Sequence, residues 1–279
     1  MKLFVTGAAG MLGQRVVGVA RELGHDAVGS DIDDLDLTDA EAVRARLRAA
    51  APVAVVNCAA YTDVDGAESH EELATLVNAT AAANVARACQ EIAAFVVQVS
   101  TDYVFAGEAT RPYVESDEPA PRTAYGRSKL AGEREVARSG AAFAIGRTAW
   151  LYGAGGKNFV DTMLALAATR DEVSVVTDQR GCPTWTGHLA PALVEIAERR
   201  DEGLHHLTSQ GDCSWYELTV EVFHQAGVSC RVLPTTTDAF PRPAPRPAYS
   251  VLGTERTDPV LLPRWQEGVA AHLSERVPA

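Results

Sequence analysis

Short apolar runs alternate along the first half of the chain with longer segments in which apolar residues recur every three or four positions. Apolar runs of strand length occupy residues 2–6, 26–30, 53–57, 94–99 and 143–148. Helical patterns fill the intervals, up to residue 23 and over residues 39–49, 71–91 and 124–139. This alternation predicts an α/β fold built on a doubly wound parallel sheet, with helices on both faces. In the usual order of such a sheet the fourth strand lies beside the first.

The pattern becomes less regular after residue 150. It indicates helices near residues 159–168, 188–199, 216–226 and 265–275, a strand near 173–176, and a Pro- and Thr-rich loop over 234–247. We therefore expect a nucleotide-binding domain over residues 1–150, followed by a smaller C-terminal lobe. That lobe, over residues 151–279, is expected mainly to bind substrate, with some of its segments returning to the first domain.

A glycine-rich turn joins the first strand to the first helix. Gly7, Gly10 and Gly13 are spaced three apart, with Met11 and Leu12 between the last two. Gly7 permits a tight turn, Gly10 lets the backbone approach a pyrophosphate, and Gly13 lets the helix pack closely. The free N–H groups at the start of the helix then face the anion. Glycines also serve ordinary turns, but this position between strand and helix predicts dinucleotide binding.

The residues after the second and third strands extend this prediction. Asp31 follows the second strand, where an acid can bind the adenosine ribose hydroxyls and would repel a 2′-phosphate. The loop therefore favours NADH over NADPH, and Arg15 is the one early basic residue that could reach such a phosphate. Ala59 and Ala60, after the third strand, are small enough for a ligand to approach closely, although simple packing explains them equally well.

The candidate catalytic chemistry lies after the fourth strand and in the next helix. Ser100 and Thr101 follow that strand and should open onto the cofactor crevice. Tyr125 and Lys129 are four residues apart and leave the same helical face, as ordinary amphipathic pairs also do. A free phenol has a pKa of about 10, and we expect the nearby ammonium to lower it. Tyr125 would then protonate a carbonyl oxygen as hydride reaches the carbon.

Composition and charge narrow the class. The 279 residues are 47% hydrophobic and 22% charged, and the formal net charge is −12. The charged residues are spread along the chain, without a block of Lys or Arg. These values are typical of a soluble globular protein and argue against nucleic acid or a membrane surface as partner. The five cysteines lack the paired spacing of zinc sites. We expect reduced thiols, no catalytic metal and a cytoplasmic location.

Several motifs together resemble one protein family. The glycine turn, Thr101 and the Tyr125–Lys129 pair resemble the extended short-chain dehydrogenase/reductase superfamily, which has a Rossmann fold. Within it the chain is similar to the dTDP-4-dehydrorhamnose reductase family from Met1 to about Leu252. The motifs that carry this resemblance are Ser100-Thr101-Asp102-Tyr103-Val104-Phe105-x-Gly107, Arg147-Thr148-x-Trp150-Leu151-Tyr152-Gly153, Asn158-Phe159, Asp178-Gln179-x-Gly181-x-Pro183-Thr184 and Arg246-Pro247-x-x-Ser250.

The resemblance implies NADH- or NADPH-dependent reduction of the C4 ketone of a dTDP-4-keto-6-deoxy sugar. In that reaction Tyr125 would donate the proton, Lys129 would support Tyr125 electrostatically and hold the nicotinamide ribose, and Thr101 would bind the ketone. Tyr103 and Trp150 would contact the substrate, and Arg246 would bind its diphosphate, which suits a forked guanidinium. A homodimer is the assembly that the resemblance suggests.

The chain also departs from the family pattern. Many members carry Thr-Arg after the second strand, suited to the phosphate of NADPH, where Asp31-Ile32 stands here. Some members have an early-helix Glu associated with magnesium at a dimer contact. Gln14-Arg15 stands at that place, so we expect no such metal.

Four alternatives remain open to different degrees. A sugar-nucleotide 4,6-dehydratase would need an Asp-Glu pair after the Thr, but Asp102 is followed by Tyr103. An epimerase shares the Tyr/Lys pair, and a 4-ketoreductase could act on another nucleotide sugar. A regulatory subunit of methionine adenosyltransferase also resembles this branch and is not catalytic, so fold alone does not prove an enzyme. Retention of Thr101, Tyr125 and Lys129 favours catalysis.

Overall fold

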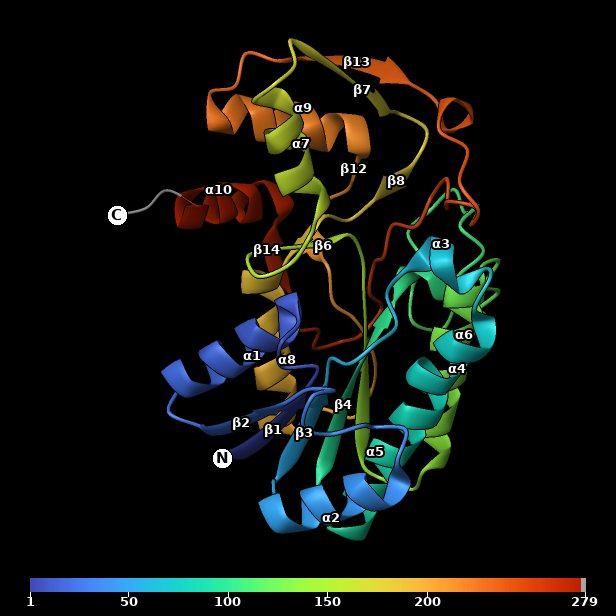
Figure 1. Cartoon of the computed structure of the whole chain (residues 1–279), viewed down its shortest axis with the longest axis vertical. Coiled ribbons are helices and arrows are strands. Elements are labelled where there is room, and N and C mark those ends of the chain that lie inside the picture. Colours follow the sequence, from blue (N-terminus) through green and yellow to red (C-terminus); the bar gives the residue numbers. More distant parts are fainter. Residues whose placement is uncertain (277–279) are drawn as a thin grey trace.

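A parallel sheet forms the centre of the larger domain. The computed structural model describes residues 1–276, and within them this sheet has six strands. Every neighbouring pair in the sheet is parallel. In spatial order the strands are β2 (Asp26–Ser30), β1 (Lys2–Thr6), β3 (Ala54–Asn57), β4 (Phe95–Thr101), β5 (Phe143–Thr148) and β10 (Gly203–His206). The predicted doubly wound α/β fold is confirmed (Figure 1).

The predicted neighbour of β1 was wrong. Strand β3, and not β4, pairs with β1, with Leu3 opposite Ala54 and Thr6 opposite Asn57. Strand β4 lies one place further out, beside β3. After β2 is added on one side of β1, the chain crosses over and adds β3 on the other side. In open α/β sheets, ligands bind at such a switch in strand order, outside the carboxyl ends of the strands.

Helices cover both faces of this sheet (Figure 1). On one face α1 (Met11–Glu22) packs with α8 (Thr186–Arg199), and this core contains Leu3 and Val5 of β1. On the other face lie α2 (Ala40–Ala50), α5 (Ala81–Glu91) and α6 (Ala124–Arg138), in contact with one another or with the sheet, and Phe4 belongs to this second core. Alternate residues of one buried strand thus serve opposite layers, as the period of a strand requires.

A smaller lobe lies beyond the carboxyl ends of the strands, at the top of Figure 1. It has its own apolar core, which contains Val160, Val173, Phe223 and Trp265. Its principal elements are α7 (Phe159–Ala167), β7 (Glu172–Val176), α9 (Trp215–Ala226), β13 (Arg231–Thr235) and α10 (Trp265–Arg276), and β7 pairs in parallel with β13. The intervening segment that contains α8 and β10 returns to the larger domain.

Shorter elements connect these parts. They are α3 (Val64–Ala67), α4 (Glu71–Thr75), the π-helical η1 (Leu76–Thr80), η2 (Asp102–Val104), β6 (Leu151–Tyr152), β8 (Arg180–Gly181), β9 (Thr184–Trp185), β11 (Ser209–Gln210), β12 (Cys213–Ser214), η3 (Thr237–Ala239) and β14 (Leu262–Arg264).

Several elements differ from those expected from the sequence. Strand β4 is longer than predicted because Ser100 and Thr101 still belong to it. The helix expected over residues 71–91 contains the π-helical segment η1, and the loop expected over 234–247 begins inside β13. Strand β10 was not predicted. This short segment is a strand because it pairs with β5, which lies far from it in the sequence.

Candidate active site

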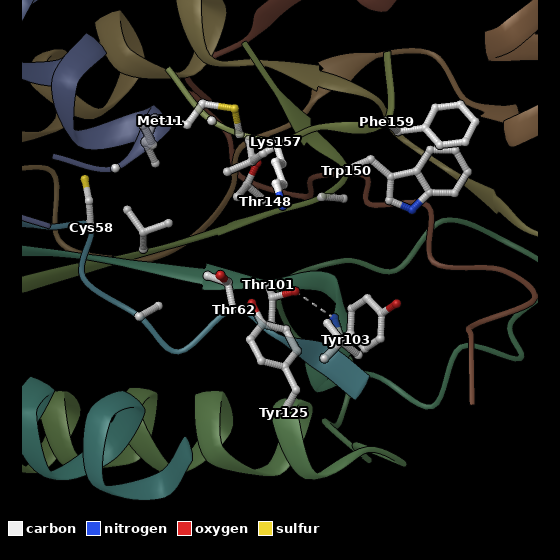
Figure 2. A pocket seen from close by; sticks show the side chains of 18 of the residues that line it. Met11, Cys58, Thr62, Thr101, Tyr103, Tyr125, Thr148, Trp150, Lys157 and Phe159 are labelled. Carbon is white, nitrogen blue, oxygen red and sulfur yellow. Dashed lines mark hydrogen bonds between the residues drawn. The ribbon is translucent and has the colours of Figure 1, made fainter. Parts of the chain in front are cut away.

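A large cavity opens between the carboxyl edge of the sheet and the smaller lobe (Figure 2). Its volume is about 1600 Å³, and its lining includes residues from both parts of the molecule. Every candidate site residue from the sequence lies on it. These residues are Gly7, Gly10, Met11, Leu12, Gly13, Asp31, Ala59, Ala60, Thr101, Tyr103, Tyr125, Lys129, Trp150 and Arg246.

The glycine turn forms a cradle at the start of α1. Gly7 has a φ of 64°, and a Cβ there would lie 2.7 Å from the backbone nitrogen of Ala59. A Cβ on Gly13 would lie 2.1 Å from the carbonyl oxygen of Gly7. No side chain caps α1 at Gly10, so the first N–H groups of the helix are available to a ligand. The backbone geometry therefore suits an anion such as a pyrophosphate.

Asp31 is held against this cradle. Its carboxylate accepts hydrogen bonds from the backbone nitrogens of Ala9, at 2.7 Å, and Ile32, at 2.8 Å. Asp34 in turn accepts from the backbone nitrogen of Asp31 and from the Ser30 hydroxyl. The acid thus has a fixed orientation at the end of β2, where it lines the cavity.

A buried hydrogen-bonded row crosses three strands below the cavity. Thr6 donates to Asn57 at 2.5 Å, Asn57 donates to Gln98 at 2.7 Å, and Gln98 donates to the carbonyl oxygen of Val99 at 2.9 Å. The Lys129 ammonium donates to the same carbonyl at 2.7 Å. This row links β1, β3 and β4 to the Lys129 side chain, and it fixes the floor of the site.

Lys129 is buried on α6 with 4% of its surface exposed. Burial lowers the pKa of Lys129 to about 8, and the charges of Glu133 and Cys58 partly offset this effect. The ammonium has therefore lost much of its hydration and is held by the Val99 carbonyl.

Tyr125 rises from α6 and places its phenol beside Thr101 (Figure 2). Burial raises the pKa of Tyr125 to about 12, and the Thr101 hydroxyl partly offsets the shift. The prediction that Lys129 would lower this pKa was wrong, because Lys129 does not count among the groups that shift it. Desolvation of the phenol dominates instead, and it keeps Tyr125 protonated at neutral pH.

Thr101 ends β4 and is held by its neighbours. Its hydroxyl accepts a hydrogen bond from the backbone nitrogen of Tyr103 at 3.2 Å and donates to Asp102 at 2.9 Å (Figure 2 draws the first). Asp102 is 2% exposed, and burial raises its pKa to about 6. From the sequence, Asp102 belonged to a family motif and counted against a dehydratase, but it was given no role in the site.

A buried ion pair holds α6 against β5. Arg147 on β5 donates to Glu133 through Nε at 2.9 Å and Nη2 at 2.7 Å, and Ser100 donates to the same carboxylate at 2.5 Å. Both charged side chains are at most 5% exposed. This pair and the Ser100 hydroxyl connect β5 with β4 and α6, the two elements that carry the candidate catalytic groups.

Aromatic side chains line the cavity at the smaller lobe. Trp150 stacks on Trp215 with ring centroids 3.5 Å apart and an interplanar angle of 5°, and Phe159 packs against Trp215 at 4.3 Å. Trp150 has a φ of 48°, which is uncommon for a residue other than glycine. A Cβ on Gly181 would lie 2.5 Å from the Trp150 ring. Phe159 lay inside a motif, but Trp215 had no sequence signal.

Arg246 lies on the cavity but already has a partner. It donates to Asp65 on α3 at 2.7 Å, and Arg242 lies 3.6 Å from the same carboxylate. These cations hold the pKa of Asp65 below its usual range although burial acts against them. Burial also raises the pKa of Tyr103 well above its ordinary value. A diphosphate would therefore have to compete with Asp65 for Arg246, which the sequence did not reveal.

Two further properties concern the described residues as a whole. Within residues 1–276, no group of three or more His, Cys, Asp or Glu side chains has the arrangement of a metal site. None of the helices in the same range is long and apolar enough to cross a membrane. All five cysteines are free.

A cavity at the switch in strand order of a doubly wound parallel sheet is the arrangement of Rossmann-type nucleotide-binding proteins. Thr101, Tyr125 and Lys129 on the same cavity place the chain, within that class, among the short-chain dehydrogenase/reductase proteins. Comparison with known proteins narrows the class further.

A family model described as the RmlD substrate binding domain matches residues 1–277. A probable dTDP-4,6-dihydroxy-2-methyloxan-3-one 4-ketoreductase of Streptomyces antibioticus is 47% identical over 92% of this chain and 88% of that protein. A dTDP-4-dehydrorhamnose reductase of Streptomyces griseus is 45% identical over 90% and 85% of the two chains. The crystal structure of dTDP-4-dehydrorhamnose reductase from Bacillus anthracis in complex with NADP is 37% identical, with a TM-score of 0.95 over 98% of this chain and 99% of that chain. The chain belongs to the dTDP-4-dehydrorhamnose reductase family.

Proposed function

We propose that this protein reduces the C4 ketone of a dTDP-4-keto-6-deoxy sugar with a nicotinamide coenzyme. The observation that supports this most directly is the meeting of Thr101, Tyr125 and Lys129, from two separate elements, on the cavity that also contains the glycine cradle. The names of two relatives in the same family, a 4-ketoreductase and a dTDP-4-dehydrorhamnose reductase, support the reaction and the substrate class.

The residues of the cradle fit a dinucleotide. A Cβ on Gly7 or Gly13 would meet backbone atoms, so these glycines let the turn close tightly. The uncapped start of α1 presents N–H groups to a pyrophosphate. The coenzyme, when bound, supplies the hydride for the ketone carbon. Lys129 lies four residues after Tyr125 on α6 and lines the same cavity, and we assign it to hold the coenzyme ribose.

Tyr125 has the protonation state that reduction needs. The alkoxide that forms at C4 must gain a proton, and a phenol with a pKa of about 12 carries one throughout the neutral range. The Thr101 hydroxyl beside the phenol would bind the same oxygen when its own proton points toward the cavity. The reaction then uses groups that the fold has already oriented, which lowers the cost of reorganisation.

The smaller lobe would bind the rest of the substrate. Trp150 and Tyr103 line the cavity near the catalytic groups and offer apolar surface to the sugar. Arg246 donates to Asp65 through Nη2 and to the carbonyl oxygen of Ala244 through Nη1. It would exchange Asp65 for the diphosphate, which a guanidinium can bind through two N–H groups.

We further propose that NADH is the preferred coenzyme. The Asp31 carboxylate is fixed at the end of β2, where it would accept from ribose hydroxyls and repel a 2′-phosphate. The related reductase from Bacillus anthracis has NADP bound, so this preference would distinguish the present chain from that relative.

The experiment is a spectrophotometric assay of purified protein with enzymatically prepared dTDP-4-keto-6-deoxy sugar and either coenzyme. Wild type should oxidise the coenzyme, and Tyr125→Phe should keep coenzyme affinity but lose about 10²- to 10⁴-fold in kcat. Tyr216→Phe, outside the cavity on α9, is the matched control and should keep wild-type turnover. Near-normal turnover of Tyr125→Phe would remove this residue from the mechanism.

A second candidate function is 4-ketoreduction of a different nucleotide sugar. The relative from Streptomyces antibioticus, whose name gives another 4-keto substrate, favours it. Product identification after incubation with a panel of 4-keto sugar nucleotides separates the two candidates. Coenzyme binding without consumption of any member of the panel would instead support a regulatory protein.

A further inference from the structure

The Thr101 hydroxyl has one proton and, besides the Tyr125 phenol on the cavity side, two fixed neighbours. The backbone N–H of Tyr103 can only donate, so it occupies one lone pair of Oγ1 at 3.2 Å. An ionised Asp102 can only accept, so its Oδ1 at 2.9 Å takes the single proton of Thr101. In that state Thr101 presents only a lone pair to the cavity. It cannot then donate to a ketone oxygen.

Protonation of Asp102 at Oδ1 reverses this hydrogen bond. The neutral carboxyl donates to Oγ1 of Thr101, whose own proton is released toward the cavity. Thr101 then becomes a donor beside the Tyr125 phenol, and both hydroxyls can bind one ketone oxygen. The ionisation of one buried side chain therefore decides the direction of a neighbouring hydroxyl.

Ser250 is a second hydroxyl close to this carboxyl. It comes from the Arg246-Pro247-x-x-Ser250 motif, is 1% exposed, and favours the ionised form of Asp102. Both Ser250 Oγ and Asp102 Oδ2 are buried, and neither has a hydrogen-bond partner within residues 1–276. Two motifs far apart in the chain thus meet directly behind Thr101.

We propose that Asp102, supported by Ser250, is a positioning residue that switches Thr101 between accepting and donating toward the substrate carbonyl. The inference rests on the proposed function for its catalytic consequence, but the switch itself is a property of the free protein. Ketone binding needs the donor state, because a Thr101 lone pair would otherwise face a lone pair of the ketone.

The titration of Asp102 is separated in pH from that of the titratable groups around it. Besides Thr101 and Ser250, the titratable groups that interact with it are Tyr103 on η2, Tyr125 on α6 and Cys182 between β8 and β9. Burial raises the pKa of Cys182 to about 11 and that of Tyr125 to about 12, and it raises the pKa of Tyr103 further. All three therefore stay neutral while Asp102 titrates near a pKa of about 6.

The first test is the pH dependence of kcat/KM for ketone reduction at saturating coenzyme. Wild type should lose activity as the pH rises through about 6, by about tenfold per pH unit above the midpoint. Asp102→Asn should abolish this fall, because its amide can donate to Thr101 while its carbonyl accepts from Ser250. Ser250→Ala should move the midpoint to higher pH, because it removes a group that favours the carboxylate. Glu195→Gln, on the exposed face of α8, is the control and should keep the wild-type profile.

The second test does not need turnover. Carboxyl carbon NMR of aspartate-labelled protein should show one signal that is absent in Asp102→Asn, titrates near pH 6, and shifts to higher pH in Ser250→Ala. An Asp102 signal with the ordinary midpoint of about 4 would overturn the proposal. An Asp102→Asn profile that keeps the wild-type fall would also overturn it. Absence of reductase activity would refute the proposed function while the NMR titration still decides the switch.

Discussion

The buried pair of Glu133 and Arg147 gives the most demanding prediction for the fold beneath the site. Replacement of Glu133 by Gln removes the charge that balances Arg147, whose side chain is 3% exposed. The Gln amide also cannot accept both guanidinium hydrogen bonds, at 2.9 and 2.7 Å, through two oxygens. The variant therefore leaves an uncompensated charge in the interior, between β5 and α6.

The expected loss can be bounded with a second pair on the same helix. Removal of one partner from a buried ion pair costs about 3–5 kcal/mol, which is a large part of the roughly 5–15 kcal/mol that stabilises a typical domain. Arg127 and Glu71 form the same two-pronged contact, with both distances at 2.7 Å, but both side chains are more than 40% exposed. An exposed pair contributes about 0–1 kcal/mol. Burial, together with the Ser100 hydrogen bond that Glu133 accepts, therefore separates the two variants.

The assay is equilibrium urea unfolding of wild type, Glu133→Gln and Glu71→Gln at neutral pH. We expect the first variant to lose about 3–5 kcal/mol and the second at most about 1 kcal/mol. A difference between them below about 1 kcal/mol would refute the argument that burial makes the Glu133 contact decisive. A second readout is catalytic. Glu133 raises the pKa of Lys129, so its removal should move the alkaline loss of activity to lower pH.

Three further predictions concern the coenzyme site. Lys129 has a lowered pKa of about 8, so its charge should disappear as the pH rises through that value and the fall of kcat/KM that begins near pH 6 should become steeper there, whereas Lys129→Arg should lack this second titration. Gly13→Ala places a Cβ against the Gly7 carbonyl and should abolish coenzyme binding in a fluorescence titration. Its control, Gly18→Ala in the same helix, meets open space and should stabilise the fold by about 0.5–1 kcal/mol in thermal unfolding. Asp31→Ser should raise the ratio of kcat/KM for NADPH to that for NADH roughly tenfold, since it removes a charge that repels the 2′-phosphate; an unchanged ratio would contradict the proposed preference.

Most elements of the larger domain could be predicted from the local spacing of apolar residues. The bounds of β1, β2 and β5 follow from short apolar runs, and the glycine turn marks the start of α1 because its position between strand and helix is itself local. The same reasoning placed Tyr125 and Lys129 on one face of α6. Four-residue spacing on a helix needs no knowledge of the rest of the fold.

Long-range packing decided what the sequence pattern could not. Strand order depends on which edges pair, so only the folded chain shows β3 between β1 and β4. Burial is likewise a property of the whole fold, and it raises the pKa of Tyr125 where the neighbouring lysine alone would lower it.

The amino-acid sequence by itself thus determined the elements, the nucleotide-binding turn and the identity of the candidate catalytic side chains. The tertiary structure decided their partners: Val99 for Lys129, Asp65 for Arg246, and Asp102 with Ser250 behind Thr101. The reason is physical. A helix or a turn is specified by neighbours within a few residues, but hydrogen-bond direction and ionisation depend on groups that only folding brings together and removes from water.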